Sequence, residues 1–173
     1  GTFFRTQSRK STRQTKTNLR QTDPVSNTNK TGKLPFLNGY VFHCNNATEI
    51  GCMNFSVFGS GSSDFRRMKE NVQPKQTCLF LYNMQKKRIV QGIFIATSPC
   101  EKRICTEVDW VQRYPSQVFV KQIYKTSAIK IEKWKAKQKK LDRKDVEKMI
   151  VDAGVNVATL TKAFNNTTIT EVS

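Results

Sequence analysis

The sequence predicts a mixed α+β fold: one small β-rich domain with short flanking helices, a basic arm before it and a helical extension after it. Three observations support this prediction. Residues 78–82 and 93–96 are continuously apolar and are separated by a polar turn, which is typical of a hairpin. Residues 1–33 contain few apolar side chains, and these lack any period. Residues 142–164 carry apolar side chains at helical spacing.

These patterns divide the 173 residues into a basic arm at 1–33, a β-rich domain at 34–124 and a Lys-rich segment with C-terminal helices at 125–173. The length suits a single domain with appendages. The apolar fraction of 37% is below the about 45–50% of wholly globular chains. Part of the chain is therefore expected to pack no core.

The arm is expected to be disordered when alone. Its basic residues face a single acid, Asp23, and Thr, Ser, Gln and Asn fill the gaps. Such a segment buries too little surface to offset its ordering entropy. Basic arms of this kind become ordered along phosphates. The arm residues expected to contact RNA are Arg5, Arg9, Lys10, Arg13, Lys16 and Arg20.

The first half of the β-rich domain opens with a strand at 39–44, which an Asn pair ends. A helix is predicted over 48–58, with Thr48 as its N-cap. Its buried face would carry Ile50, Met53 and Val57. The Gly- and Ser-rich residues 58–63 predict a loop, and residues 65–72 a short basic helical turn.

The second half holds the clearest strands. Residues 77–83 and 88–96 form the predicted hairpin, and their apolar character indicates burial on both faces or in a closed barrel. Another strand is predicted at 117–124. The domain could hold a pocket near Asn45, Asn46 and Asn83, whose side chains could pair with base edges. The favoured interpretation is that these asparagines end strands and stabilise turns.

The C-terminal segment alternates apolar and charged residues at 128–133, as an edge strand does. An amphipathic helix follows at 142–153 and stops at Gly154. Its inward side chains would be Val146, Met149 and Ile150. A second helical stretch would carry Val157, Leu160 and Phe164.

The net charge of +17 calls for a polyanion: nucleic acid, an anionic membrane surface or an acidic protein. Charge that merely keeps the protein soluble is the remaining alternative. No apolar run approaches the about 20 residues of a membrane helix, and no secretory signal is recognisable. The odd number of cysteines, five, then favours a reducing compartment over a disulfide framework.

The Lys-rich segment gives the sharpest functional signal. Its basic side chains point in nearly every direction of a helix, so some must face outward, and we expect them to contact RNA phosphates. They are Lys133, Lys135, Lys137, Lys139, Lys140, Arg143 and Lys144. Trp134 among them suits stacking on unpaired bases. Packing of Trp134 onto the domain is nevertheless the favoured interpretation, because tryptophans are usually core anchors.

The sequence gives little support for catalysis. The chain holds one His, His43, and no glycine-rich phosphate loop precedes a helix. Neighbouring residues of a strand point to opposite faces, so His43 and Cys44 are not expected to share a ligand. The cysteine spacings are wider than those of common zinc sites. We therefore predict no enzyme activity, no cofactor, no metal and no small-molecule substrate.

Several short motifs of residues 39–124 fall in one recognisable order. Leu79-Phe80-Leu81-Tyr82-Asn83 carries an LFL motif whole, and Phe58-Gly59 matches the first half of FGLP. Pro115-Ser116-Gln117-Val118 matches PAQV with one change. Together with the opening at 39–48 and the strand at 92–98, they resemble the DCD domain, named for development and cell death.

The sequence departs from that family in places. Ser60 and Gly61 stand where the family has Leu-Pro, and no clear PLxE motif follows Pro115. The resemblance implies a mixed α/β pseudo-barrel of the PUA-like class, in which several relatives bind RNA or modified bases. The DCD family itself is described mainly through stress and cell-death signalling. The resemblance therefore implies binding rather than catalysis.

From charge and resemblance we expect an RNA-binding accessory subunit of a ribonucleoprotein assembly, ribosomal or mitoribosomal, in contact with structured rRNA and neighbouring proteins. The alternative is a protein-interaction module in stress or cell-death signalling. The acid-poor, Arg-, Ser- and Thr-rich start resembles the remainder of a mitochondrial transit peptide, although it lacks a clear amphipathic pattern. A mitochondrial location is therefore predicted, with nuclear and cytosolic locations as alternatives.

Overall fold

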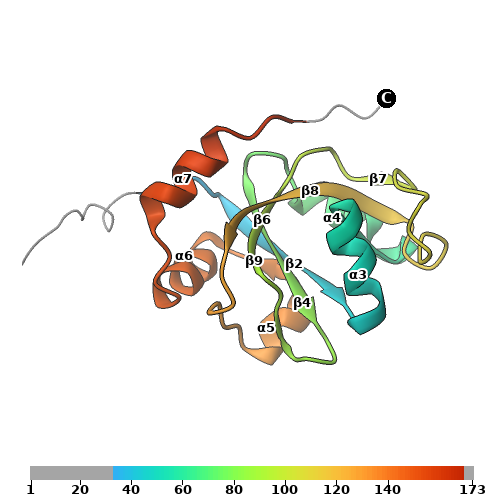
Figure 1. The fold of residues 1–173 in the computed structure, drawn as a ribbon, viewed down its shortest axis with the longest axis horizontal. Helices are drawn as coiled ribbons and strands as arrows, with labels where there is room; N and C mark the ends of the chain where they lie inside the picture. Colours follow the sequence, from blue (N-terminus) through green and yellow to red (C-terminus); the bar gives the residue numbers. More distant parts are fainter. Residues whose placement is uncertain (1–32, 170–173) are drawn as a thin grey trace, which may run out of the picture.

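The computed structural model describes residues 33–169. All of the predicted disordered arm except Lys33, including its six RNA-contacting residues, lies outside the described residues. A curled mixed sheet forms the centre of the described part, and short helices surround it (Figure 1). The strands are β2 (Asn38–Cys44), β3 (Val57–Ser60), β4 (Thr77–Asn83), β5 (Arg88–Ile89), β6 (Gly92–Ala96), β7 (Glu101–Lys102), β8 (Ser116–Lys125) and β9 (Lys140–Leu141).

The helices are α3 (Asn46–Phe55), the 3-10 turn η3 (Ser62–Asp64), α4 (Phe65–Asn71), α5 (Lys133–Gln138), α6 (Arg143–Asp152) and α7 (Val157–Asn165). The main path of the sheet runs β3-β8-β6-β4-β2-β9. The pair β2–β4 is parallel and the remaining pairs are antiparallel. This arrangement, a curled half-barrel with short helices, confirms the predicted mixed α/β fold class.

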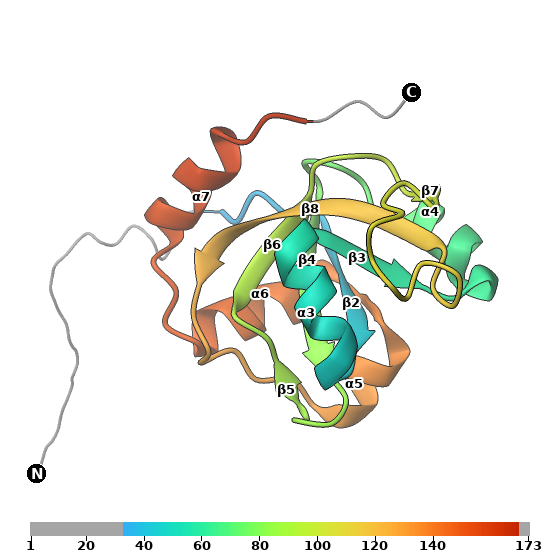
Figure 2. The same ribbon diagram turned by 45° about the vertical axis from the view of Figure 1, so that its right-hand side comes forward.

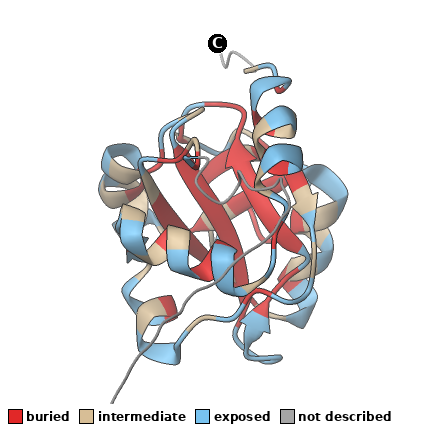
Figure 3. Ribbon diagram, turned by 90° about the vertical axis from the view of Figure 1, so that its left-hand side faces the viewer, coloured by how far each residue is buried: buried red, intermediate tan, exposed pale blue. Residues whose placement is uncertain are grey.

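Both faces of the sheet are covered. One core cluster lies on the α3 face and includes Phe42, Phe58 and Leu81, whereas the other lies on the α6 face and includes Phe80 and Ile95. Figure 2 shows α3 in front of the strands and α6 behind them. In Figure 3 the strands are almost wholly buried, while the helices keep exposed outer turns. Burial of the hairpin strands on both faces is therefore confirmed.

The first helix differs from its prediction. It begins at Asn46 rather than Thr48, because Asn45 is the N-cap and Thr48 completes a capping box with it. The predicted inward residue Ile50 is 63% exposed, whereas Thr48 and Cys52 are buried. Ile50 is two residues from each of these and therefore lies about 200° from them around the helix axis, on the solvent side.

Two other segments were predicted wrongly. The expected loop at 58–63 contains most of strand β3, which pairs with β8 at the edge of the sheet. The expected edge strand at 128–133 has no strand pairing. The edge of β2 is covered instead by β9, with Gly39 opposite Leu141.

The C-terminal helices agree with prediction. Asp142 caps α6, and Val146, Met149 and Ile150 are buried on it. On α7 the buried side chains include Leu160 and Phe164. All five belong to the α6-face cluster, which they share with side chains of β2, β4 and β6. Within residues 33–169, no helix has the length and apolar character needed to cross a membrane.

Candidate nucleic-acid interface

The basic segment forms a short surface helix, α5, at one end of the sheet (Figure 1). Its buried position is taken by Ala136, whereas Lys133, Trp134 and Lys137 are exposed, with Trp134 at 58%. The interpretation of Trp134 as a core anchor was therefore wrong. Helix positions three and four apart are neighbours, so Lys133 and Trp134 both lie beside Lys137. We call these three side chains the α5 patch.

The indole of Trp134 has an anchored cation beside it. The Nζ atom of Lys135 lies 5.4 Å from the centroid of the Trp134 ring. The same Nζ is bonded to the carboxylate of Asp145 on α6, and this hydrogen bond raises the pKa of Lys135. The ammonium group of Lys135 therefore lies against the Trp134 ring, and 58% of the tryptophan remains exposed to solvent.

An ion pair joins Lys139, the C-cap residue of α5, to Asp64 at the end of η3. The Asp64 carboxylate accepts hydrogen bonds from Lys139 Nζ at 2.9 Å, from Arg67 at 2.7 Å and from the Ser60 hydroxyl. Burial opposes ionisation of Asp64, but these three donors outweigh it and hold its pKa well below the usual range. The Val41 amide donates to the carbonyl of Lys139 at 2.8 Å, which leads the chain into β9.

The basic residues predicted to contact RNA therefore fall into two groups. Three are engaged in ion pairs with acids: Lys135 with Asp145, Lys139 with Asp64 and Arg143 with Glu147. Four are exposed and pair with no acid among residues 33–169, namely Lys133, Lys137, Lys140 and Lys144. These four are the ones whose charge is open to a polyanion. The arm residues Arg5, Arg9, Lys10, Arg13, Lys16 and Arg20 lie outside the described residues.

A cavity of about 320 Å³ opens beside Lys139. Its walls come from the ends of β2 and β3, from α3, from the turn after β4 and from the loop before β8. The lining residues are His43, Cys44, Asn45, Thr48, Cys52, Gly59, Ser60, Gly61, Asp64, Met84, Trp110, Tyr114 and Lys139. Segments far apart in the sequence thus meet at one place next to α5.

Two glycines make room for the aromatic wall of this cavity. A Cβ atom at Gly59 would lie 2.5 Å from Cζ3 of Trp110, and one at Gly51 would lie 2.7 Å from its Nε1. Any side chain at either position would therefore displace the indole. The ring of Trp110 meets that of Tyr114 in a T-shaped arrangement, with centroids 6.2 Å apart. Trp110 itself is only 4% exposed.

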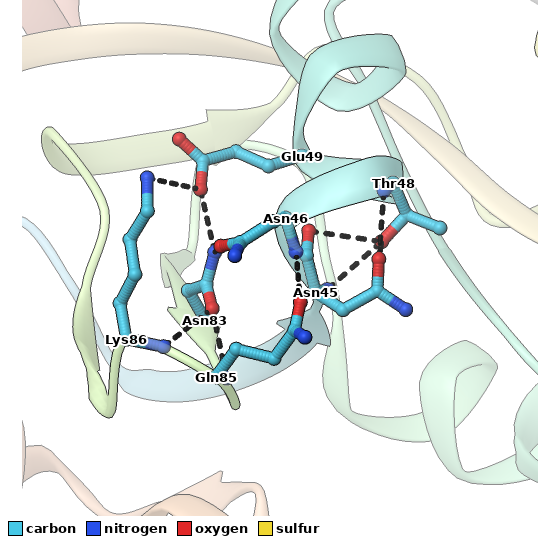
Figure 4. Close-up of polar contacts among 7 residues, drawn as sticks. All are labelled: Asn45, Asn46, Thr48, Glu49, Asn83, Gln85 and Lys86. Atoms are coloured by element: carbon cyan, nitrogen blue, oxygen red, sulfur yellow. Dashed lines mark hydrogen bonds and ion pairs between the residues drawn. The ribbon is translucent and has the colours of Figure 1, made fainter.

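Asn83, at the end of β4, serves the turn, as predicted, and Asn45 caps α3. Asn83 is fully buried, and its Oδ1 accepts from the amides of Gln85 and Lys86 at 2.9 and 2.8 Å. Its Nδ2 donates to Asn46 at 3.1 Å and to Glu49 at 2.7 Å (Figure 4). All of its polar atoms are used, so Asn83 has none left for a base edge.

His43 and the cysteines show no sign of reactive chemistry. Burial lowers the pKa of His43, which is therefore neutral at pH 7, and its Nε2 lies 2.7 Å from the carbonyl of Ala136. All five cysteines are free and buried, and burial raises the pKa of Cys52 and of Cys100 to about 12. Within residues 33–169, no three His, Cys, Asp or Glu side chains are grouped to hold a metal ion.

Comparison with known proteins identifies the family. The model of the development and cell death domain matches residues 38–153, which is most of the chain. The chain belongs to the development and cell death domain family. The comparison with curated proteins gives no match. The match extends beyond the motifs recognised in the sequence and includes α5, β9 and α6 of this DCD chain.

Solved structures of YTH domains share a partial likeness with this DCD chain. The Mmi1 YTH domain aligns with a TM-score of 0.49 and 11% identity, over 68% of this chain and 88% of that one. A Mmi1 YTH domain in complex with RNA gives 0.46 and 10%, over 72% and 85%. The Pho92 YTH domain in complex with m6A gives 0.41 and 14%, over 49% and 54%. Likeness at this level carries no argument about function.

The DCD motifs lie where the cavity is built. Phe58-Gly59 forms the middle of β3, and Gly59 lies against Trp110. Gln117 of the motif at the start of β8 is fully buried, and its side chain accepts from the Cys105 amide at 2.8 Å. Of the three asparagines at which a pocket was considered from the sequence, Asn45 lines the cavity, whereas Asn46 and Asn83 do not. The residues that mark the cavity are Gly51 and Gly59, which leave room for the ring of Trp110. Trp110 is far from both glycines in the sequence, and only the fold brings them together.

Proposed function

We propose that this DCD protein binds RNA without catalysing a reaction, with the α5 patch as a contact surface of its described part. The observation that supports this most is the exposed indole of Trp134 between two exposed lysines that pair with no acid among residues 33–169. An aromatic platform amid cations suits single-stranded nucleic acid, in which bases stack and phosphates meet ammonium groups.

The charges argue for a polyanion rather than for a neutral partner. Lys140 and Lys144 follow the α5 patch closely in the chain and are exposed as well. Clustered unpaired lysines repel one another, and a phosphate backbone relieves this repulsion while it releases counterions. In the full chain, the arm residues between Arg5 and Arg20 would add to this attraction. Affinity is then mainly electrostatic and weakly dependent on base sequence.

At a finer level, we propose a place in a ribonucleoprotein assembly, ribosomal or mitoribosomal. The observation behind it is the combination of a compact domain with a long basic arm, a form that suits docking on folded RNA with the arm along phosphates. The acid-poor composition of the arm supports mitochondria as the compartment.

Binding of the full chain to an unstructured RNA of about 10 nucleotides tests the proposal by fluorescence anisotropy. Trp134→Ala should weaken binding by about 1–3 kcal/mol, or about 5- to 150-fold in Kd, because one base loses its platform. Lys133→Ala with Lys137→Ala should reduce the slope of log K against log salt, between about 50 and 200 mM, by about 1.4.

Matched controls remove the same groups elsewhere. Leu37→Ala removes an apolar side chain of 57% exposure, and Lys121→Ala with Lys162→Ala removes two exposed lysines of β8 and α7. These variants should bind like the unchanged chain. Equal affinity and salt slope in the α5-patch variants would rule the patch out. A protein partner that survives RNase during copurification, with no RNA enriched, would favour the protein-interaction module instead.

A further inference from the structure

The cavity beside α5 has walls suited to a flat, neutral ring. Trp110 and Tyr114 present aromatic surface, while Met84 and the thiols of Cys44 and Cys52 add soft apolar contacts. Its volume of about 320 Å³ lies at the small end of ligand sites, which begin at about 300 Å³. A ring system of one or two fused rings suits such a space better than a long flexible chain.

The charged groups of the cavity are already paired with one another. Asp64 is shared by Lys139 at 2.9 Å and Arg67 at 2.7 Å, and Lys139 also lies 3.4 Å from the Ser60 hydroxyl. The carboxylate therefore cannot serve a cationic ligand, and the ammonium of Lys139 is not free for an anion. The group that enters the cavity is expected to be uncharged.

Polar groups with spare capacity stand around the same space. Asn45 uses its Oδ1 to accept from Thr48, and its Nδ2 donates to no acceptor among residues 33–169. Figure 4 shows this amide nitrogen turned away from the Asn83 network. The bond from His43 Nε2 to the carbonyl of Ala136 requires the proton on Nε2, which leaves Nδ1 as an acceptor.

The backbone of β3 adds a donor and an acceptor. The Val120 amide donates to Ser56 at 2.9 Å, so Ser56, Phe58 and Ser60 face β8 in the antiparallel alternation. The amide and carbonyl of Gly59 then point away from β8, toward the open edge of the sheet. Gly59 lines the cavity, and a nucleobase edge carries this kind of mixed donor and acceptor pattern.

We propose that the cavity receives one unpaired nucleobase of a bound RNA strand, with its ring against Trp110 and Tyr114 and its polar edge toward Asn45 and Gly59. The sugar and phosphates stay outside. Met84 at the cavity wall is 40% exposed and stands in the same turn as Lys87, which is exposed too. This proposal rests on the proposed RNA binding, because it assigns that function a base-binding site distinct from the α5 patch.

The chain contains two tryptophans, so Trp134→Phe leaves Trp110 as the sole indole reporter. In this background, titration with each of the four ribonucleoside monophosphates should quench Trp110 fluorescence for at least one of them. Two variants should abolish the quenching. Gly61→Leu places a side chain at the cavity lining, where a Cβ meets no atom within 4 Å and the φ of −65° suits any residue. Asn45→Asp keeps the helix cap but replaces the Nδ2 donor.

Ser63→Leu is the matched control, because Ser63 is exposed nearby and does not line the cavity. It should quench as the background does, and all variants should melt at the same temperature. With Trp134 present, Gly61→Leu should weaken RNA binding at least about fivefold.

Quenching that persists unchanged in both Gly61→Leu and Asn45→Asp would overturn the proposal, as would quenching by peptides but not by nucleotides. RNA binding through the α5 patch without any nucleotide quenching would overturn the base site and leave the proposed function standing. Nucleotide quenching that both variants abolish, without any effect of the α5-patch substitutions on RNA binding, would support the base site and remove the patch from the interface.

Discussion

Replacing Asp64 by Asn would leave Lys139 and Arg67 without the carboxylate they share. The side chains of Asp64 and Lys139 are only 17% and 14% exposed, so solvent replaces little of what is lost. Breaking a buried ion pair by removing one partner costs about 3–5 kcal/mol. An amide oxygen remains as an acceptor, and we therefore expect a loss of about 2–4 kcal/mol in the free energy of unfolding at pH 7.

The pH dependence of this loss has a definite sign. The pKa of Asp64 in the folded protein lies below its ordinary value of 3.8, because three donors favour the ionised form over the opposing effect of burial. Its contribution is therefore complete above that ordinary value and fades as the pH falls below it toward the folded pKa. The stability difference between the unchanged chain and Asp64→Asn should be constant from about pH 5 to 8 and shrink below about pH 4.

Urea denaturation followed by fluorescence and circular dichroism measures both quantities. Glu101→Gln is the matched control, since the Lys69–Glu101 pair has 43% exposure on both sides and such surface pairs contribute about 0–1 kcal/mol. A loss below about 1 kcal/mol for Asp64→Asn, or a difference that does not change between pH 5 and pH 3, would refute the role assigned to the Asp64 cluster.

Three further substitutions test the packing. Ile150→Ala on α6 should cost about 2–5 kcal/mol, with one unfolding transition reported by Trp110 and by helix content alike; two separate transitions would contradict the shared core. Gly59→Ala should lower the free energy of unfolding by about 1–3 kcal/mol and change the fluorescence of Trp110, because the added methyl group meets the indole. Gly61→Ala should change neither the stability nor the fluorescence. Asn83→Ala should cost at least about 2 kcal/mol in urea denaturation, because the amides of Gln85 and Lys86 and the carboxylate of Glu49 lose their buried partner. Unaltered stability would show that the turn does not depend on Asn83.

Local sequence signals predicted the elements that carry their own burial pattern. The hairpin strands are apolar without interruption, and α6 repeats its apolar side chains at helical spacing from Val146 to Ile150. Both patterns depend only on neighbouring residues. Strand β3 lacked such a pattern, since Gly59 and Ser60 carry almost no side chain, and its pairing partner β8 lies more than fifty residues away.

The candidate sites differ in how far local reasoning could reach. The excess of lysine around α5 was visible in the sequence. The ion pairs of Lys135 with Asp145 and of Lys139 with Asp64 were not, because these acids approach the lysines only in the folded chain. The exposure of Trp134 follows from the small size of α5, whose one buried position is filled by Ala136. The cavity is built from five separated segments, and of its lining residues only Asn45 was considered for a pocket from the sequence.

The pairing of β2 with β9 bears on how the chain folds during synthesis. Gly39 is synthesised more than a hundred residues before Leu141, its neighbour at the sheet edge. Until then the outer edge of β2 has unpaired amides and carbonyls, and such an edge is a template for association with other chains. Long-range pairing of this kind also slows folding. We therefore expect the nascent protein to be most prone to association with other chains until translation has passed β9.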